Sequence, residues 1–196
     1  MRKEITLGEI CEFVRGPFGG SLKKNIFVNE GFAVYEQQHA INNQCENFRY
    51  YINEEKFLGM QRFKVKPGDI LMSCSGTIGK TTIVPADAPV GIINQALLKI
   101  TPSNVLNVNF LKFYMQSRLF HEQLMDTVDG AAIKNVASVK ILKNIIIRLP
   151  PLAEQERVVA KLEAAFAEID ETLHITENKL FELGNLKKAV LLEILQ

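Results

Sequence analysis

One short segment carries most of the features of a phosphate-binding loop. Ser75-Gly76-Thr77-Ile78-Gly79-Lys80-Thr81 ends like a Walker A motif, in which backbone N–H groups and a lysine hold nucleotide phosphates. The first glycine of that motif is replaced by Cys74. The β-branched run after Lys80 ends at Pro85 and favours a strand, whereas a phosphate loop must open a helix. The sequence therefore argues against nucleotide hydrolysis.

The spacing of cysteines and histidines gives neither a metal site nor a disulfide framework. These residues are scattered along the chain as Cys11, Cys45, Cys74, His39, His121 and His174. No C-x-x-C pair occurs, and His121-Glu122 lacks the second histidine of H-E-x-x-H because position 125 is Met. We expect the cysteines to be buried thiols, and we expect no metal and no other cofactor.

A second catalytic pattern lacks the residue that would accept the hydrogen bonds. Leu149-Pro150-Pro151-Leu152 contains the prolines of the Asn/Asp-Pro-Pro-aromatic motif of amino-methyltransferases, whose amide or acid accepts hydrogen bonds from the target amino group. Leu149 cannot accept them. The sequence also lacks a G-x-S-x-G elbow and an evident set of nucleophile, base and orienting residue. We predict no catalysis, and an enzyme with a site outside these patterns is kept as an alternative.

A glycine-rich loop near the N-terminus combines cations with small residues. The segment from Arg15 to Lys24 holds three cations, and its glycines permit close approach of a backbone. Cations bind phosphate, and small residues leave room for it. The candidate contacts to DNA phosphate are Arg15, Lys23, Lys24, Lys80 and Lys134. The same loop pattern is typical of a rigid structural turn, and that alternative stays open.

Side-chain amides gather in further segments. Glu36-Gln37-Gln38-His39 is followed by Asn42-Asn43-Gln44, Asn94-Gln95 stands beside a predicted strand, and Lys134-Asn135 follows a flexible stretch. Amides can pair with N6 and N7 of adenine in the major groove. The candidate base contacts are Gln37, Gln38, His39, Asn42, Asn94, Gln95 and Asn135. Asn and Gln are also common in loops and helix caps, so the amides alone do not decide the matter.

Residues 1–149 have the pattern of an α+β domain with many short strands and a few helices. Thr6 and Glu9 form a capping box for a short helix through Cys11. The other predicted elements are strands Phe63–Val65, Ile70–Ser73, Thr81–Val84, Ala96–Thr101 and Ile145–Leu149, a turn at Lys66–Asp69, and helices capped by Asn109 and Ser138.

Residues 150–196 predict one long coiled-coil helix. Pro150-Pro151 can start it, no proline follows, and ten of thirteen seam positions are apolar over about six heptads. The apolar seam residues are Leu152, Val159, Leu162, Phe166, Ile169, Leu173, Leu180, Leu183, Val190 and Ile194. The polar seam positions Gln155, Thr176 and Lys187 either fix the register of a helix pair or mark where another subunit binds.

This helix would be roughly 65 Å long at about 1.5 Å per residue, which exceeds what a domain of this size can cover. It therefore needs a partner helix. A single amphipathic helix folded along its own domain is the alternative.

Charge differs between the two parts of the chain. Residues 1–150 hold 18 Lys and Arg against 13 Asp and Glu, a net charge of +5, whereas residues 151–196 hold 5 against 9, a net charge of −4. The first part favours binding to a polyanion, although a mildly basic solvated surface would have the same charge count.

No apolar run approaches the roughly 18 to 20 residues of a membrane span, and Met1-Arg2-Lys3-Glu4 leads into no signal peptide. We expect a cytoplasmic protein without membrane contact.

Together these segments resemble the specificity subunit of type I restriction-modification systems. The resemblance rests on Leu7–Ile10, Gly16–Gly19, Gly68–Leu71 leading into Ser75–Lys80, Asn94-Gln95, and Leu149–Leu152 with Glu154-Gln155 and the long helix. It implies a DNA-binding target recognition domain at 1–149 and a conserved spacer helix for dimerisation at 150–196. It also implies that Ser75–Lys80 is a structural hairpin and that the subunit has no catalysis of its own.

The resemblance implies partners as well. These are double-stranded DNA with a bipartite target, modification subunits that carry S-adenosylmethionine and methylate adenine, and a restriction and translocation subunit. Such subunits normally carry two recognition domains and two spacer helices, whereas this sequence has one of each. It is therefore half-sized, either as a natural half subunit or as part of a longer one.

Two copies can replace the missing half by pairing their helices antiparallel. A two-fold dimer would read an interrupted palindrome, because target symmetry mirrors protein symmetry. The alternative from another class is a coiled-coil scaffold or adaptor whose globular domain binds protein.

Overall fold

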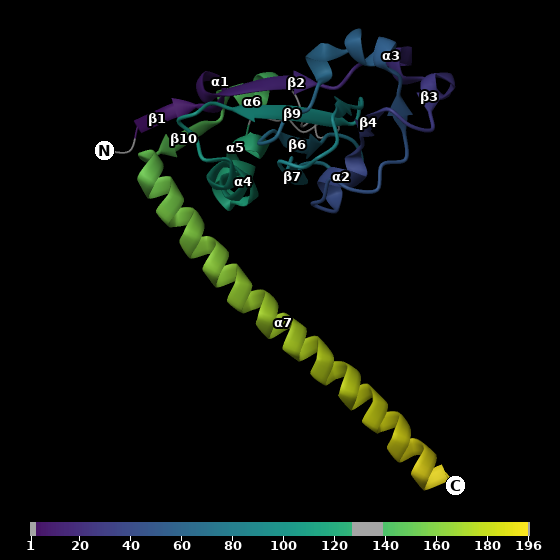
Figure 1. The fold of residues 1–196 in the computed structure, drawn as a ribbon. Coiled ribbons are helices and arrows are strands. Elements are labelled where there is room, and N and C mark those ends of the chain that lie inside the picture. The colour runs from purple at the N-terminus through teal and green to yellow at the C-terminus, as the bar shows by residue number, and fades with distance from the viewer. Residues whose placement is uncertain (1–2, 127–138, 196) are drawn as a thin grey trace. The chain divides into compact units, whose positions relative to one another are not determined.

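A computed structural model describes residues 3–126 and 139–195. The chain divides into two compact units, Met1–Gln155 and Glu156–Gln196. The first unit mixes short strands with helices (Figure 1), which confirms the α+β class predicted from the sequence.

The described part of the first unit contains three small sheets. Their strands are β1 (Lys3–Thr6), β2 (Cys11–Arg15), β3 (Phe27–Val28), β4 (Phe32–Tyr35), β5 (Tyr51–Ile52), β6 (Ile70–Ser73), β7 (Thr81–Ile83), β8 (Gly91–Ile93), β9 (Leu97–Pro102) and β10 (Ile146–Leu149). The sheet orders are β1-β10, β2-β9-β6-β7 and β3-β5-β4-β8. The pairs are antiparallel except β4–β8, which is parallel.

The helices of this unit are short. They are α1 (Leu7–Ile10), α2 (Gln37–Ile41), α3 (Glu54–Leu58), α4 (Val108–Gln116), α5 (Arg118–Asp126) and α6 (Val139–Asn144), together with 3₁₀ turns at Gly19–Leu22, Lys24–Ile26 and Gln61–Phe63. Helices α4, α5 and α6 contribute Leu111, Phe120 and Leu142 to one core cluster with the inner side chains of β2, β6 and β9.

The two four-stranded sheets share a core. Successive side chains of a strand point to opposite faces. In β6, Ile70 and Met72 therefore lie in the core cluster under α4 to α6, and Leu71 lies in a second cluster. Strand β4 contributes Tyr35 to that second cluster and Val34 to a third one, which α3 covers. The layers therefore run from helices through one sheet, a shared core and the other sheet to α3.

Local signals placed several elements correctly. The Thr6 N–H donates to the Glu9 carboxylate at 2.8 Å, which is one of the two bonds of the predicted capping box, and the Thr6 hydroxyl also donates to that carboxylate at 2.8 Å. The three cysteines are buried and free, also as predicted. The strand predictions at 70–73, 81–84, 96–101 and 145–149 are confirmed to within one residue at each end.

Two local predictions were wrong. Phe63–Val65 is not a strand, because Phe63 ends the 3₁₀ turn Gln61–Phe63 and Lys64 forms only an isolated bridge with Ile92. Helix α4 is capped by Asn107 and not by Asn109. The Asn107 Oδ1 accepts from the N–H groups two and three residues later, at 3.0 and 3.1 Å. The predicted cap Ser138 lies outside the described residues.

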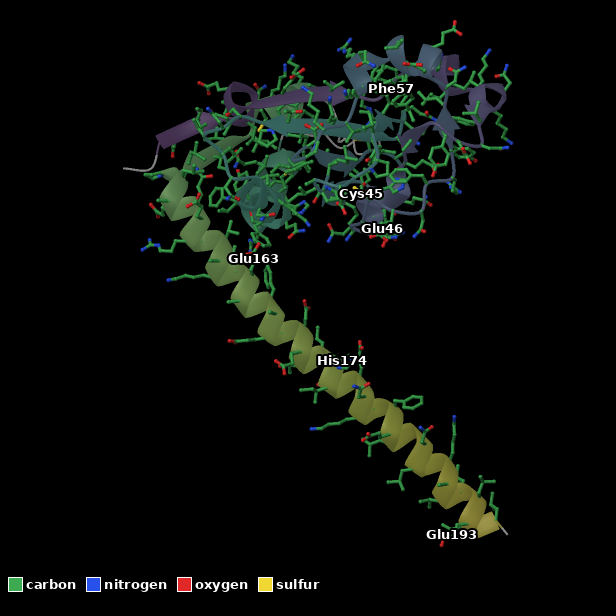
Figure 2. The ribbon with its side chains drawn as sticks, in the orientation of Figure 1. Cys45, Glu46, Phe57, Glu163, His174 and Glu193 are labelled. Atoms are coloured by element: carbon green, nitrogen blue, oxygen red, sulfur yellow. The ribbon has the colours of Figure 1, made fainter. Side chains whose placement is uncertain are left out.

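The helix α7 (Leu152–Leu195) confirms the predicted long helix. Figure 2 shows Glu163, His174 and Glu193 projecting from it. The apolar seam residues from Phe166 onward are exposed, from 43% for Val190 to 75% for Ile194, whereas Val159 is buried. An exposed apolar stripe on a long helix is the pattern of a helix that packs on another helix.

Gln155 is the exception among the polar seam positions. Its side chain is fully buried within the first unit. The Gln155 Nε2 donates to the carbonyls of Val105 and Pro150 at 3.0 and 2.9 Å, and its Oε1 accepts from the Asn107 N–H at 2.8 Å. Both amide N–H donors are therefore used, and Gln155 serves the globular unit and not a helix seam.

Candidate nucleic-acid interface

The parallel pairing of β4 and β8 brings two amide-rich segments together. Tyr35 and Ile93 are register partners, so the chain leaves both strands at the same edge of the sheet. The Asn94 N–H donates to the Tyr35 carbonyl at 2.9 Å. Helix α2, with Gln37 and Gln38, therefore starts next to Asn94-Gln95.

The second four-stranded sheet, β2-β9-β6-β7, has strand ends at the same place. Arg15 at the end of β2 pairs with Leu98, and Ser73 at the end of β6 pairs with Leu97. The Gly16 N–H donates to the Leu97 carbonyl at 2.9 Å, and the Cys74 N–H donates to the Ala96 carbonyl at 2.8 Å. These contacts join the ends of β2 and β6 to the turn that begins at Asn94.

Four segments named from the sequence thus meet at one place, which we call the strand-end edge. It consists of Arg15–Pro17, Gln37–Asn42, Ser75–Lys80 and Asn94–Gln95. Gly16 makes the close approach possible, because a Cβ there would lie 1.8 Å from the Asn94 carbonyl oxygen.

The Ser75–Lys80 segment is a hairpin loop between β6 and β7. Gly76 and Gly79 have φ of +58° and +84°, and the Lys80 N–H donates to the Ser73 Oγ at 3.0 Å. The chain continues into a strand and not into a helix, as expected from the β-branched residues. A Cβ at Gly76 would lie 3.8 Å from the Gln37 Nε2, so this loop borders α2.

The predicted base contacts differ in accessibility. Asn42 and Gln95 are exposed, and Gln37 and Gln38 are partly exposed. The Gln38 Nε2 makes a long contact of 3.4 Å to the Asn47 carbonyl. Asn94 shapes its own turn, since its Oδ1 accepts from the Ala96 N–H at 3.0 Å.

His39 lies in the core, and its predicted base contact is corrected accordingly. It is 1% exposed and its ring stacks on Phe48 with centroids 4.6 Å apart. The His39 Nδ1 accepts from the Glu36 N–H at 2.8 Å, and burial lowers the pKa of the imidazole. The Glu36 carboxylate is itself held by the Arg49 guanidinium at 2.7 and 3.0 Å. The Glu36-x-x-His39 spacing was the available sign that this histidine belongs to the start of a helix.

The predicted phosphate contacts also divide. Lys23, Lys24 and Lys80 are exposed. Arg15 is partly buried, and its Nη1 is enclosed without a hydrogen-bond partner among the described residues. Burial raises the pKa of the neighbouring Cys74 thiol to about 11, against the opposing effect of the Arg15 guanidinium. Arg15 therefore points at least partly into the protein.

The predicted phosphate contact Lys134 and the predicted base contact Asn135 lie outside the described residues.

Among residues 3–126 and 139–195, no helix combines the length and the apolar character needed to cross a membrane.

Comparison with known proteins identifies the family. The model of the type I restriction modification DNA specificity domain matches residues 2–180. The chain belongs to this family. This family match agrees with the motifs found in the sequence and with the long helix that follows the α+β unit.

Two curated relatives are specificity subunits from Escherichia coli. The EcoBI specificity subunit is 31% identical over 141 residues, which are 71% of this chain and 29% of that protein. The EcoKI specificity subunit of strain K12 is 27% identical over 182 residues, which are 81% of this chain and 38% of that protein. The chain thus spans about a third of the length of these relatives.

Solved structures show the same fold. A chain from a structure of type I R-M system assembly superposes with a TM-score of 0.75 at 21% identity, covering 95% of this chain and 44% of that one. The HsdS subunit from Thermoanaerobacter tengcongensis superposes with a TM-score of 0.64 at 23% identity, covering 86% and 38%.

Proposed function

We propose that this chain is a non-catalytic DNA-recognition subunit of a type I restriction-modification complex. Residues 1–149 would read one half of a bipartite target, and residues 150–196 would serve as the spacer and dimerisation helix. The observation that carries the proposal is the strand-end edge, because strand pairing gathers there most of the described segments that carry cations and amides. Membership of the DNA specificity domain family supports the same role.

Within this proposal the recognition domain makes two kinds of contact. The exposed cations Lys23, Lys24 and Lys80 bind phosphates and set the position of the domain on DNA. The amides at the edge read bases: Gln37, Gln38, Asn42, Asn94 and Gln95. Arg15 contributes through the part of its guanidinium that is not enclosed, and Lys134 and Asn135 stay predictions.

The helix α7 supplies assembly. Its exposed seam would pair antiparallel with the seam of a second copy and hold two recognition domains at opposite ends. Near the C-terminal end of α7, Phe181 and Leu195 are exposed apolar residues that lie on a different face from the seam at 3.6 residues per turn. One face can then bind the second copy while the other binds a modification subunit, and the restriction subunit joins that complex.

Co-expression with a modification subunit, followed by mapping of methylated adenines, tests the recognition role. We expect methylation at an interrupted palindrome, because a two-fold dimer presents the same reading edge twice. Methylation by the purified chain alone, given S-adenosylmethionine, would refute a non-catalytic subunit. Absence of salt-dependent DNA binding would favour the scaffold or adaptor alternative.

Light scattering tests the pairing of helices. We expect a dimer at micromolar concentration and a monomer after Leu173→Glu with Leu180→Glu, because charges in a seam oppose helix packing. Glu171→Gln with Glu182→Gln, outside the seam, is the matched control and should remain a dimer. A wild-type monomer at these concentrations would count against the dimer and would leave the family membership intact.

A further inference from the structure

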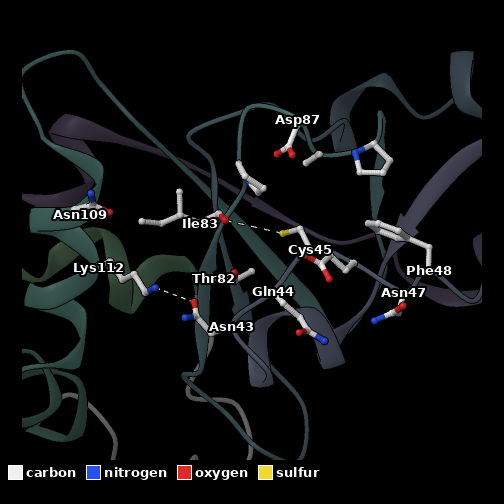
Figure 3. Close-up of a pocket in the computed structure, with 14 residues that line it drawn as sticks. Asn43, Gln44, Cys45, Asn47, Phe48, Thr82, Ile83, Asp87, Asn109 and Lys112 are labelled. Carbon is white, nitrogen blue, oxygen red and sulfur yellow. Dashed lines mark hydrogen bonds between the residues drawn. The ribbon is translucent and has the colours of Figure 1, made fainter. Parts of the chain in front are cut away.

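A groove follows β7 between the segment after α2 and helix α4. Its larger part, of about 720 Å³, is lined by Asn43 to Phe48, by Thr82 and Ile83 of β7, and by Asn109 and Lys112 of α4 (Figure 3). Its smaller part, of about 460 Å³, includes Lys80 and Thr81 and shares Asn43 with the first part. We call this surface the β7 groove, and it starts at the strand-end edge, where Lys80 ends the hairpin loop.

Lys112 is the cation of the larger part. The helical spacing of α4 turns Asn109, Lys112 and Gln116 toward the groove, while Leu111 and Met115 enter the core. The Lys112 Nζ donates to the Asn43 Oδ1 at 2.8 Å (Figure 3). An ammonium has three N–H donors, so this contact leaves capacity for an anion.

The surroundings of Lys112 favour a negatively charged ligand. Its side chain is partly buried, and burial lowers the pKa of the ammonium. Among the described residues, the ion pairs formed by Lys and Arg side chains do not include Lys112. A partly desolvated cation held by one neutral amide is costly, and a bound anion would offset that cost.

The acidic residues of the groove limit where an anion can sit. Glu46 and Asp87 also line the larger part. Figure 3 shows Asp87 and Lys112 on opposite sides of this pocket. An anion would therefore occupy the side formed by Asn43 and Lys112, which continues toward Lys80.

We propose that the β7 groove binds a phosphate of the DNA backbone through the Lys112 ammonium, which Asn43 orients. The interface then extends from the strand-end edge along β7 to α4, over elements that the sequence motifs do not mark. This inference rests on the proposed DNA-binding function and adds one phosphate contact to it.

The test is the salt dependence of binding to a fluorescein-labelled 30-base-pair duplex of random sequence, followed by anisotropy with the full chain. One lost phosphate contact reduces the slope of log K against log salt by about 0.9. Between 50 and 200 mM salt, wild type should therefore lose about 3.5-fold more affinity than Lys112→Gln. Lys112→Arg keeps the charge and should keep the wild-type slope.

The matched control is Lys66→Gln. Lys66 is exposed in the turn before β6, at the opposite end of that strand from the hairpin loop, and the same charge is removed. We expect its slope to equal that of wild type. Acetylation of wild type with and without the duplex gives a readout that needs no variant, and Lys112 should be protected by DNA while Lys66 is not.

The outcomes separate this inference from the proposed function. An unchanged slope for Lys112→Gln and unprotected Lys112, while Lys80→Gln lowers the slope, would overturn the groove contact and leave the strand-end edge in place. A wild-type chain that does not bind the duplex at 50 mM salt would overturn both.

Discussion

The hydrogen bonds of Gln155 predict that this residue stabilises the globular unit. Gln155→Leu keeps a similar volume but removes every polar atom of the side chain. The Asn107 N–H and the carbonyls of Val105 and Pro150 then lose the partner that they have in the structure. The perturbation is therefore local to the turn before α4 and to Pro150, two residues before α7 begins.

The expected cost follows from how deeply these groups lie. A buried polar group that loses its partner costs about 1–3 kcal/mol. The bond to Pro150 is buried, whereas those to Asn107 and Val105 are partly buried and can regain some water. We therefore expect Gln155→Leu to lower the free energy of unfolding of the first unit by about 3 kcal/mol.

Urea unfolding followed by tyrosine fluorescence measures this unit separately. The four tyrosines lie between residues 35 and 114, and the chain has no Trp, so α7 contributes nothing to the signal. Thr176→Ala is the control, because Thr176 donates only to the Thr172 carbonyl on an exposed part of α7. It should change the free energy of unfolding by less than about 0.5 kcal/mol.

A loss below about 1 kcal/mol for Gln155→Leu would refute this reasoning. If the same variant instead changed the oligomeric state and left the tyrosine transition unchanged, Gln155 would be a seam residue that sets helix register.

Other positions give further expectations. Because the folded-state pKa of His39 is lowered, the unfolded state takes up the proton first, so unfolding free energy should fall as pH drops below about 6.5. His39→Gln should flatten this dependence in urea titrations at pH 7.5 and 5.5. Gly16→Ala should weaken duplex binding and lower the thermal midpoint, while Gly59→Ala, with its nearest atom at 3.6 Å, should change neither. Asp69→Ala should cost roughly 3 kcal/mol in urea unfolding, since its buried carboxylate accepts from a hydroxyl and a backbone N–H.

The sequence by itself determined the features that depend on near neighbours. The helix α7 follows from heptad spacing and the absence of proline after Pro151, because each turn of a helix is closed by residues four apart. The β-branched residues after Lys80 were enough to reject a phosphate loop, since they favour a strand. The capping box likewise joins Thr6 to Glu9, which is only three residues further along the chain.

Motif resemblance went further than periodicity. The set of short motifs pointed to the specificity subunit family, and the family model confirms it over residues 2–180. Composition and spacing alone predicted only a basic globular part followed by a long helix that needs a partner helix.

Only the tertiary structure decided which candidate residues share a surface. The strand-end edge depends on the parallel pairing of β4 with β8 and on β9 lying between β2 and β6, and neither pairing is written in a local pattern. Tertiary packing also decided that His39 is buried, that Gln155 bonds within the globular unit and not in a helix seam, and that Lys112 contacts Asn43. Gln155 and Lys112 have partners 48 and 69 residues away in the chain, and local spacing carries no information about such partners.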